Sequence, residues 1–226
     1  MHFDIHALDG QWGGLARGFV DTLWLCLLGG TMAGVLGIVL LAGQRRGGTF
    51  LARLLRLYTD ITLALPLLVV LYVAFFVLPA FGVLLPARLV GTLTLAVYYA
   101  PYIAEVIRAA VAAVPAGTVE AGTAIGMSPW AIGWRIVTPQ ALPLLLPTLT
   151  GLAIGLLKDS ALLSIISVHE FMFAAKEAVS ETYAPLEVYL VVALVYWAAT
   201  ATLHAASRHW EKRLGRTAAP LPALSR

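Results

Sequence analysis

The sequence predicts an all-α integral membrane protein with five transmembrane helices, an N-terminus outside the cytoplasm and a C-terminus inside it. Hydrophobic residues make up 60% of the 226 residues and charged residues only 12%, and the mean hydropathy is +0.87. A soluble domain of this length needs more charge to cover its surface. Long apolar segments and a one-sided distribution of basic residues complete the argument.

Five apolar segments are long enough to cross a bilayer core, which takes about 20 helical residues. They are residues 18–42, 61–81, 89–107, 141–168 and 186–206. The first segment is too long for the apolar part of a signal peptide and has no basic segment at its start, so we interpret it as a retained helix. Five spans put the two termini on opposite sides of the membrane.

Basic residues indicate which side each terminus faces. Eleven of them fall on one side of this arrangement: Arg45, Arg46, Arg53, Arg56, Arg108, Arg135, Arg208, Lys212, Arg213, Arg216 and Arg226. The remaining four are assigned to the other side or to the membrane: Arg17, Arg88, Lys158 and Lys176. The positive-inside rule therefore places the N-terminus outside and the tail in the cytoplasm.

Cysteine content and charge exclude two classes of function. The single cysteine, Cys26, lies in the first apolar segment, so neither an intramolecular disulfide nor a thiolate metal cluster can form. The net charge of +3 comes from basic residues that are too few and too scattered for a nucleic-acid-binding face. We therefore expect no nucleic-acid partner and no metal site.

Charged residues mark the outer start of the first segment and the inner end of the third. Asp21 is expected to cap the first helix. Glu105 and Arg108 are one helical turn apart, so they can form a structural ion pair at i,i+3. Residues 114–117 read Val-Pro-Ala-Gly, and proline and glycine end the third helix there.

The connection over about residues 115–139 does not read as membrane. A short helix is predicted to start near Thr118, with Glu120 in its first turn, where the helix dipole favours a carboxylate. Gly122 and Gly126 are one turn apart and give this helix a bare flank that another backbone or groove can approach.

A second short helix is predicted in the same connection. Ser128 and Pro129 form a cap and first-position pair, Trp130 and Trp134 share one face, and Thr138-Pro139 ends the helix. Composition and spacing leave an alternative open, in which both short helices are amphipathic turns lying on the membrane.

The fourth apolar segment carries the adjacent charges Lys158 and Asp159. As one helix it is about 42 Å long, which exceeds a bilayer core of roughly 30 Å, so it tilts strongly or breaks near Lys158. A break there is a candidate place to receive the ammonium and carboxylate of a zwitterion. Alternatively, the two charges neutralise each other or pair with neighbouring helices.

The connection over residues 115–139 resembles the EAA loop of ABC-importer permeases. The matching positions are Glu120, Ala121, Gly122, Gly126, Pro139, Gln140, Ala141, Pro143 and Pro147. Further motifs of the polar amino acid branch, the histidine, glutamine and arginine type, match in the same order: residues 18–23, 65–68, Tyr99, 104–105 with Arg108, and 158–162. The resemblance covers residues 18 to 206.

This resemblance implies a type I importer permease fold and a function in transport of a polar amino acid or related small zwitterion. It implies segments of residues 1–17 outside, 18–206 as the permease domain and 207–226 as a cytoplasmic tail. Two ATP-binding cassette ATPase subunits would dock through Glu120, Ala121, Gly122 and Gly126. Pro66, Lys158, Asp159 and Ser160 would line the substrate path.

Further partners implied are a second permease subunit, identical or related, a solute-binding protein outside the cytoplasm, and membrane lipid. The chain lacks the phosphate loop GxxxxGK[ST], so ATP and Mg²⁺ are expected on the ATPase, with no cofactor on this chain. HExxH and GxSxG motifs are absent as well, so no catalytic residue is expected and a membrane enzyme is disfavoured. An ion-coupled secondary transporter is the alternative, although it would normally carry its own inverted repeat.

The chain also departs from the subfamily pattern at several positions. Leu63, Ala64 and Leu65 replace the usual arginine, glycine and threonine, Val70 and Thr118 replace glutamines, and Gly122 replaces the second alanine of EAA. The changes before Pro66 remove polar groups from the expected substrate path. One hypothesis is that this chain is the half of a heterodimer with the weaker substrate site.

Overall fold

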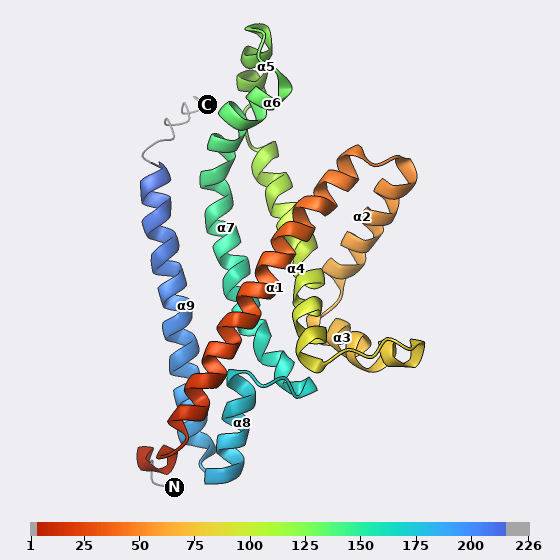
Figure 1. Cartoon of the computed structure of the whole chain (residues 1–226). Coiled ribbons are helices and arrows are strands. Elements are labelled where there is room, and N and C mark those ends of the chain that lie inside the picture. Colours follow the sequence, from red (N-terminus) through yellow and green to blue (C-terminus); the bar gives the residue numbers. More distant parts are fainter. Residues whose placement is uncertain (1–3, 216–226) are drawn as a thin grey trace. The chain divides into compact units, whose positions relative to one another are not determined.

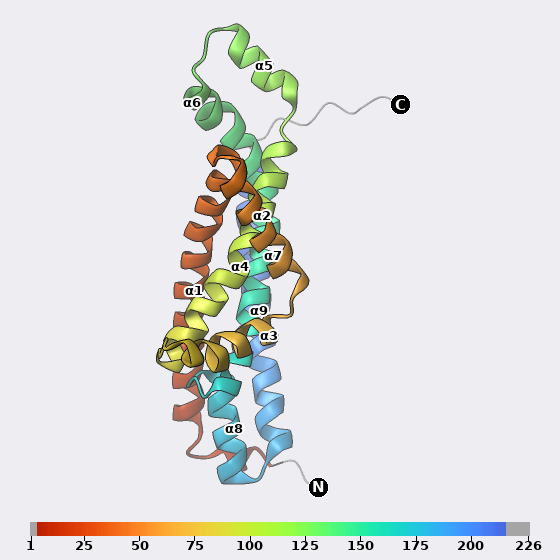
Figure 2. The same cartoon turned by 90° about the vertical axis from the view of Figure 1, so that its right-hand side faces the viewer.

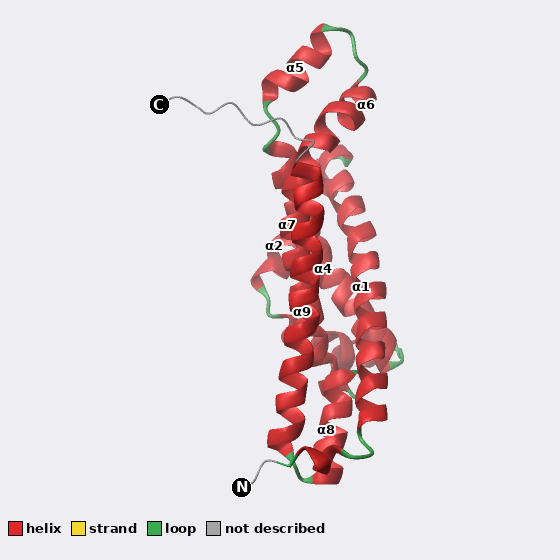
Figure 3. Cartoon of the chain, turned by 90° about the vertical axis from the view of Figure 1, so that its left-hand side faces the viewer, coloured by secondary structure: helices red, strands yellow, loops and turns green. Residues whose placement is uncertain are grey.

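A computed structural model describes residues 4–215, and in this part of the chain every regular element is a helix (Figures 1 and 3). The elements named below are α1 (Trp12–Arg46), α2 (Thr49–Ala64), α3 (Leu67–Tyr72), η2 (Val73–Val77), η3 (Leu78–Phe81), α4 (Ala87–Ala112), α5 (Ala116–Ala124), α6 (Pro129–Ile132), η4 (Gly133–Val137), α7 (Thr138–Asp159), η5 (Ser160–Ile166), α8 (Phe171–Thr182) and α9 (Pro185–Gly215). The predicted all-α class is confirmed. The predicted N-terminal segment and cytoplasmic tail fall partly on residues 1–3 and 216–226, which lie outside the described residues.

The chain forms two compact units. Of the described residues, the first comprises 4–104 and 152–201, and the second comprises 105–151 and 202–215. The first unit holds most of α1 to α4, the end of α7, all of α8 and the start of α9. The second unit holds α5 and α6 with the adjoining ends of α4, α7 and α9.

Four helices in the described part are long and apolar enough to cross a membrane. They are α1, α4, the run Pro129–Ile166 and the run Pro185–Arg213. A fifth span is obtained if α2 and the helical run Leu67–Phe81 count as one broken span, since the two are bent by 112°. The described helices therefore accommodate the five predicted spans, with the second one broken.

The second predicted span, residues 61–81, was wrong as a single helix. The structure ends α2 at Ala64 and places Leu65 in an extended conformation, with φ −96° and ψ 141°. The cause is Pro66, whose ring disfavours helical geometry at the preceding residue and which offers no N–H for a helix hydrogen bond.

In the first unit, α1 packs along α8 and α2 (Figure 2). Gly18 permits the closest approach to α8, because a Cβ built on it would lie 2.8 Å from the Cβ of Ala174. A core around Leu25, Leu71 and Leu95 fills the space between α1, α3 and α4. These contacts fix the membrane-spanning frame of this unit.

Asp21 does not cap α1 as predicted, because the helix begins nine residues earlier, at Trp12. Its Oδ1 instead accepts a hydrogen bond from Nη2 of Arg88 at 2.6 Å, which ties α1 to the start of α4. In the second unit, a smaller core of Ala110, Val114 and Ala141 joins α4 to α7.

Candidate functional site

The connection between α4 and α7 is a pair of short helices in the second unit. Its first helix, α5, begins at Ala116 after Pro115. The predicted start near Thr118 was therefore two residues late, and Glu120 lies in the second turn and not the first. The Thr118 hydroxyl donates to the carbonyl of Pro115 at 2.7 Å, which strengthens the first turn.

Gly126 ends α5 and does not lie on its flank. Its φ of +78° is left-handed, its N–H donates to the carbonyl of Thr123, and the N–H of Met127 donates to the carbonyl of Gly122, both at 3.0 Å. This is the Schellman arrangement, in which glycine adopts the left-handed residue after a helix without a steric penalty. The prediction of a bare flank made by two glycines was wrong.

Gly122 is buried inside the connection. A Cβ built on it would lie 2.8 Å from Cδ1 of Ile136 and 3.2 Å from Cγ1 of Ile132. The missing side chain therefore lets α5 pack against α6 and η4, and it is not open to a partner. The surface that α5 does present includes Glu120 and Ala121, both exposed.

The second short helix begins as predicted and ends differently. Ser128 Oγ accepts from the N–H of Ala131 at 3.3 Å, and Pro129 occupies the first helical position. The helix does not stop at Thr138-Pro139 but continues through the π turn η4 into α7. In this wider turn the N–H of Thr138 donates to the carbonyl of Gly133 five residues back, and Pro139 then falls in the first turn of α7, where proline is tolerated.

Three large apolar side chains on this connection are exposed: Ile125 (78%), Trp130 (81%) and Trp134 (67%). Ile125 lies at the turn after α5, and the two tryptophans lie one turn apart on α6 and η4. Apolar groups exposed to this degree are typical of surfaces that contact a partner.

The adjacent charges predicted for the substrate path lie at the end of α7. The α-helix stops at Asp159 and the chain continues directly as the 3₁₀ helix η5, so the helix changes type beside Lys158, where a strong tilt or a break was expected. Lys158 is exposed and Asp159 is half-buried, and they do not form an ion pair with each other. Asp159 Oδ2 accepts a hydrogen bond from the Tyr99 hydroxyl at 2.8 Å.

The other two residues predicted for the substrate path differ in exposure. Ser160 is fully buried, and its hydroxyl donates to the carbonyl of Leu157 at 2.8 Å. Pro66 is exposed at the break after α2. The carbonyl of Leu65, which the break removes from the helix ladder, accepts from the Tyr98 hydroxyl at 3.1 Å.

Glu105 and Arg108 lie near the inner end of α4, in the second unit. Nη2 of Arg108 lies 3.3 Å from Oε1 of Glu105, and each side chain is a little over one-third exposed. This geometry agrees with the predicted i,i+3 pair. An exposed pair of this kind contributes at most about 1 kcal/mol.

Glu170 is a buried acid that sequence reasoning missed. It precedes α8 and has no exposed surface. Oε1 accepts from the N–H of Phe173 at 2.7 Å and Oε2 from the hydroxyl of Thr22 on α1 at 3.2 Å. Burial raises the pKa of Glu170 to about 7, although these hydrogen bonds and the charge of Lys176 act to lower it. The sequence feature that could have indicated this buried acid is its position directly before an amphipathic segment.

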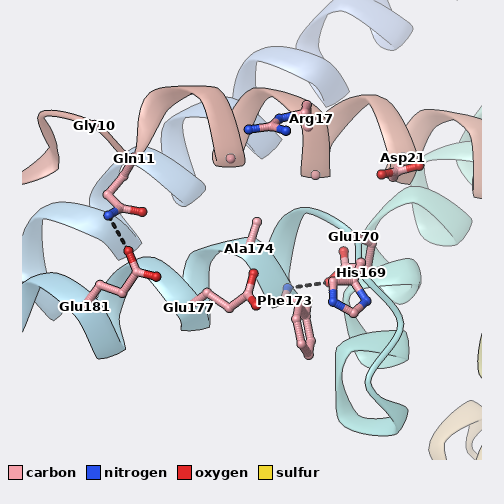
Figure 4. A pocket seen from close by; sticks show the side chains of 12 residues that line it. Gly10, Gln11, Arg17, Asp21, His169, Glu170, Phe173, Ala174, Glu177 and Glu181 are labelled. Atoms are coloured by element: carbon pink, nitrogen blue, oxygen red, sulfur yellow. Dashed lines mark hydrogen bonds between the residues drawn. The ribbon is translucent and has the colours of Figure 1, made fainter.

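Glu170 lies beside a pocket of about 410 Å³ between α1 and α8 (Figure 4). Arg17 and Asp21 line its α1 side, and Glu177 and Glu181 line its α8 side. Gln11 donates to Glu181 at 2.7 Å across the pocket. Among residues 4–215, no group of three or more metal-ligating side chains is present.

Comparisons with known proteins give one consistent result. The family model described as "Binding-protein-dependent transport system inner membrane component" matches residues 33–216. The chain is 32% identical over 218 residues to the glutamine transport system permease protein GlnP of Escherichia coli, covering 95% of this chain and 99% of that protein. It is 30% identical over 207 residues to the probable amino-acid ABC transporter permease protein y4tG of Sinorhizobium fredii, covering 92% and 90%.

Solved structures of similar fold are also transporters. The structure described as an amino acid ABC transporter with histidines matches with a TM-score of 0.88 at 29% identity, covering 94% of this chain and 100% of that chain. An inward-facing MetNI methionine ABC transporter matches with a TM-score of 0.74 at 23% identity, covering 91% and 98%, and supports the fold alone.

Proposed function

Since this chain belongs to the family of binding-protein-dependent transport system inner membrane components, we propose that it forms part of the path by which a polar amino acid or related small zwitterion enters the cell. It is a permease subunit of an ABC importer in the inner membrane, and the ATPase is a separate chain. The predicted family, importer permease fold, function class and location are thereby confirmed. The solute class is supported by the names of its relatives.

The substrate site in this proposal is the pair Lys158 and Asp159. The observation that carries it is the exposed ammonium of Lys158 next to the half-buried carboxylate of Asp159, unpaired with each other at the end of α7. Opposite charges at a helix break inside a membrane complement the carboxylate and ammonium of an amino acid. Pro66 belongs to the same path, whereas buried Ser160 supports the backbone behind it.

The coupling site in this proposal is the exposed part of the α5–α6 connection. Glu120, Ala121 and Ile125 contact an ATPase subunit, while Gly122 and Gly126 give the connection its shape. Because α5 packs on α6 and η4, and η4 continues into α7, a push on this connection is transmitted to the start of α7. ATP binding and hydrolysis on the partner then drive alternating access.

The whole transporter in this proposal contains two ATPase subunits, which bind the ATP and Mg²⁺, and a second permease subunit, identical or related. This chain binds no cofactor. A solute-binding protein delivers the substrate from outside, and lipid surrounds the spans of the permease domain, residues 18–206, with residues 1–17 outside and 207–226 in the cytoplasm. The apolar residues before Pro66 also support the hypothesis that this chain is the half of a heterodimer with the weaker substrate site. Family membership argues against an ion-coupled secondary transporter.

Affinity purification from native membranes tests the proposed function. The unmodified chain is expected to co-purify with an ATPase, and Ala121→Asp on the exposed face of α5 is expected to lose it. Thr49→Asp is the matched control, because Thr49 is exposed at the first position of α2, where the helix dipole favours an acid. An unmodified chain that brings no ATPase, or equal ATPase recovery from all three proteins, contradicts the coupling site.

A further inference from the structure

Three tyrosines on one turn of α4 form an aromatic cluster in the first unit. The ring centroids of Tyr98, Tyr99 and Tyr102 lie 5.4 to 5.9 Å apart. Their hydroxyl groups have different partners. The Tyr98 hydroxyl donates to the carbonyl of Leu65, which has left the helix ladder of α2. The Tyr102 hydroxyl lies 3.2 Å from the Tyr98 hydroxyl, and the Tyr99 hydroxyl donates to Asp159.

Tyr99 is held in a slot on α7. Its side chain is 5% exposed, and a Cβ built on Gly155 would lie 3.0 Å from its hydroxyl oxygen. Gly155 lies one turn before Asp159, so the absence of a side chain at Gly155 leaves room for the hydroxyl that bonds the carboxylate. The place of Tyr99 on α4, the space at Gly155 on α7 and the hydrogen bond to Asp159 together define one position for the Tyr99 hydroxyl.

The hydrogen bond occupies one of the two carboxylate oxygens of Asp159. Oδ2 accepts from Tyr99 at 2.8 Å, and within residues 4–215 no hydrogen bond or ion pair involves Oδ1. A carboxylate rotates about its terminal torsion unless a partner fixes it, and hydrogen bonds to charged acceptors are the stronger ones. The bond from Tyr99 therefore sets the direction in which Oδ1 points.

We infer that Tyr99 is a positioning residue for transport: it orients Asp159 so that the free carboxylate oxygen receives the ammonium group of the amino acid. The inference rests on the proposed function, because it requires Asp159 to be a substrate residue. Tyr99 acts through Asp159 and does not contact the substrate. Gly155 contributes to the same arrangement, because it leaves the room that the Tyr99 hydroxyl occupies.

The test is substrate binding by the purified transporter, permease with its ATPase, without the solute-binding protein. Leaving that protein out ensures that the measured affinity belongs to the membrane site. Each standard L-amino acid is supplied in radiolabelled form and binding is measured by equilibrium dialysis. Asp159→Asn is expected to abolish binding of the amino acid that the unmodified complex retains.

Tyr99→Phe removes only the hydroxyl and is expected to weaken binding about 10-fold, the usual effect of losing one hydrogen bond to a charged group. Gly155→Ala is expected to act in the same direction, because it displaces the hydroxyl and leaves Asp159 in place. Tyr102→Phe is the matched control. It makes the same chemical change on the same turn, and its hydroxyl is bonded to Tyr98 and not to Asp159, so binding should stay within about twofold.

Infrared difference spectra give a readout that mere packing would not move. The carboxylate stretching band of Asp159 is identified by its loss in Asp159→Asn. This band should shift in Tyr99→Phe and stay unchanged in Tyr102→Phe, with melting temperatures of both variants close to that of the unmodified protein.

Each contrary outcome has a distinct meaning. If Tyr99→Phe binds like the unmodified complex while Asp159→Asn does not bind, the inference is wrong and the proposed function stands. If Tyr99→Phe and Tyr102→Phe weaken binding equally, or the infrared band does not move, Tyr99 only packs and the inference is again wrong. If a complex that contains its ATPase binds no amino acid, the substrate site at Asp159 is wrong and the inference is wrong with it.

Discussion

Glu170 is a buried acid outside the spans whose pKa is raised. Its pKa is about 7 in the folded protein, against an ordinary value of 4.5, with burial as the largest cause. A raised pKa means that the folded state binds the proton more tightly. The stabilising contribution of protonation is therefore complete below about pH 4.5 and is lost as the pH rises towards 7.

We therefore predict that the melting temperature of the purified protein falls between these two pH values and that Glu170→Gln removes most of this fall. Glutamine keeps an acceptor for the Phe173 N–H, and its NH₂ group can donate to the Thr22 hydroxyl oxygen, so it tests charge with little change of shape. Thermal melting in detergent over this range is the measurement, with Glu177→Gln, an exposed acid on the same helix, as the control. Parallel curves for unmodified and Glu170→Gln proteins would show that Glu170 does not titrate there.

Substitution of glycine by alanine is expected to have a different effect at each of three positions in the α5–α6 connection. Gly126→Ala should destabilise the connection by about 1 kcal/mol or more, because its φ of +78° is unfavourable for any residue with a Cβ. Gly122→Ala should cost less, since its closest contact is the flexible end of Ile136. Gly117→Ala should be neutral or stabilising, because it meets open space within a helix.

Amide hydrogen exchange of residues 116–137 measures this order. Protection should be lowest for Gly126→Ala and highest for Gly117→Ala. If Gly122→Ala loses the most protection, the packing of α5 on Ile132 and Ile136 is tighter than the structure indicates. The sequence identified these small residues as important, but it could not distinguish a left-handed turn from a buried contact, because both select glycine.

At the scale of elements, the two helix breaks show what periodicity and length can and cannot indicate. For the fourth apolar segment, length alone predicted either a strong tilt or a break near Lys158, because the segment exceeds the bilayer core, and the structure shows a change of helix type there. The break at Pro66 was missed because the flanking residues are as apolar as the rest of a span, even though the proline was noted. Apolar composition locates the membrane, whereas a proline with its preceding residue determines where the helix bends.

The Pro66 break also depends on α4. The Tyr98 hydroxyl satisfies the carbonyl of Leu65, and an unpaired carbonyl in apolar surroundings costs about 1–3 kcal/mol. We predict that Tyr98→Phe lowers the melting temperature more than Tyr102→Phe does, since Tyr102 only shares a hydrogen bond with Tyr98. Thermal melting of the two variants side by side is the measurement, and equal shifts would mean that lipid or water satisfies Leu65.

For the whole molecule, the helical class and the family were predictable from one sequence, and the internal contacts of the site were not. Mean hydropathy, five apolar segments and the order of the motifs were sufficient to predict the helical class and the family. The hydrogen bond between Tyr99 and Asp159 joins residues 60 positions apart, and that of Thr22 with Glu170 joins residues 148 apart. Neither has a signature in local periodicity, because both are set by how the helices pack.

Whether α2 and the run Leu67–Phe81 cross the membrane as one broken span decides the topology of the whole chain. With five spans, the α1–α2 connection and the α5–α6 connection share the cytoplasmic side, and the segment between η3 and α4 lies outside. With four spans, α4 would have to run opposite to α1, whereas the structure packs the two helices in parallel, with Arg88 beside Asp21 and Ile103 beside Gly37. Since coupling requires an ATPase on the cytoplasmic side, the proposed function requires five.

We predict five, and single cysteines in a Cys26→Ala background measure it. Asp9→Cys, Leu84→Cys and Tyr183→Cys should react with a membrane-impermeant thiol reagent in intact cells, because all three lie in segments assigned to the outside and are exposed. Gly48→Cys should react only after the membrane is permeabilised. Leu84 is the decisive position: labelling only after permeabilisation would contradict both the five-span topology and the parallel packing of α1 and α4, and with them a cytoplasmic α5–α6 connection.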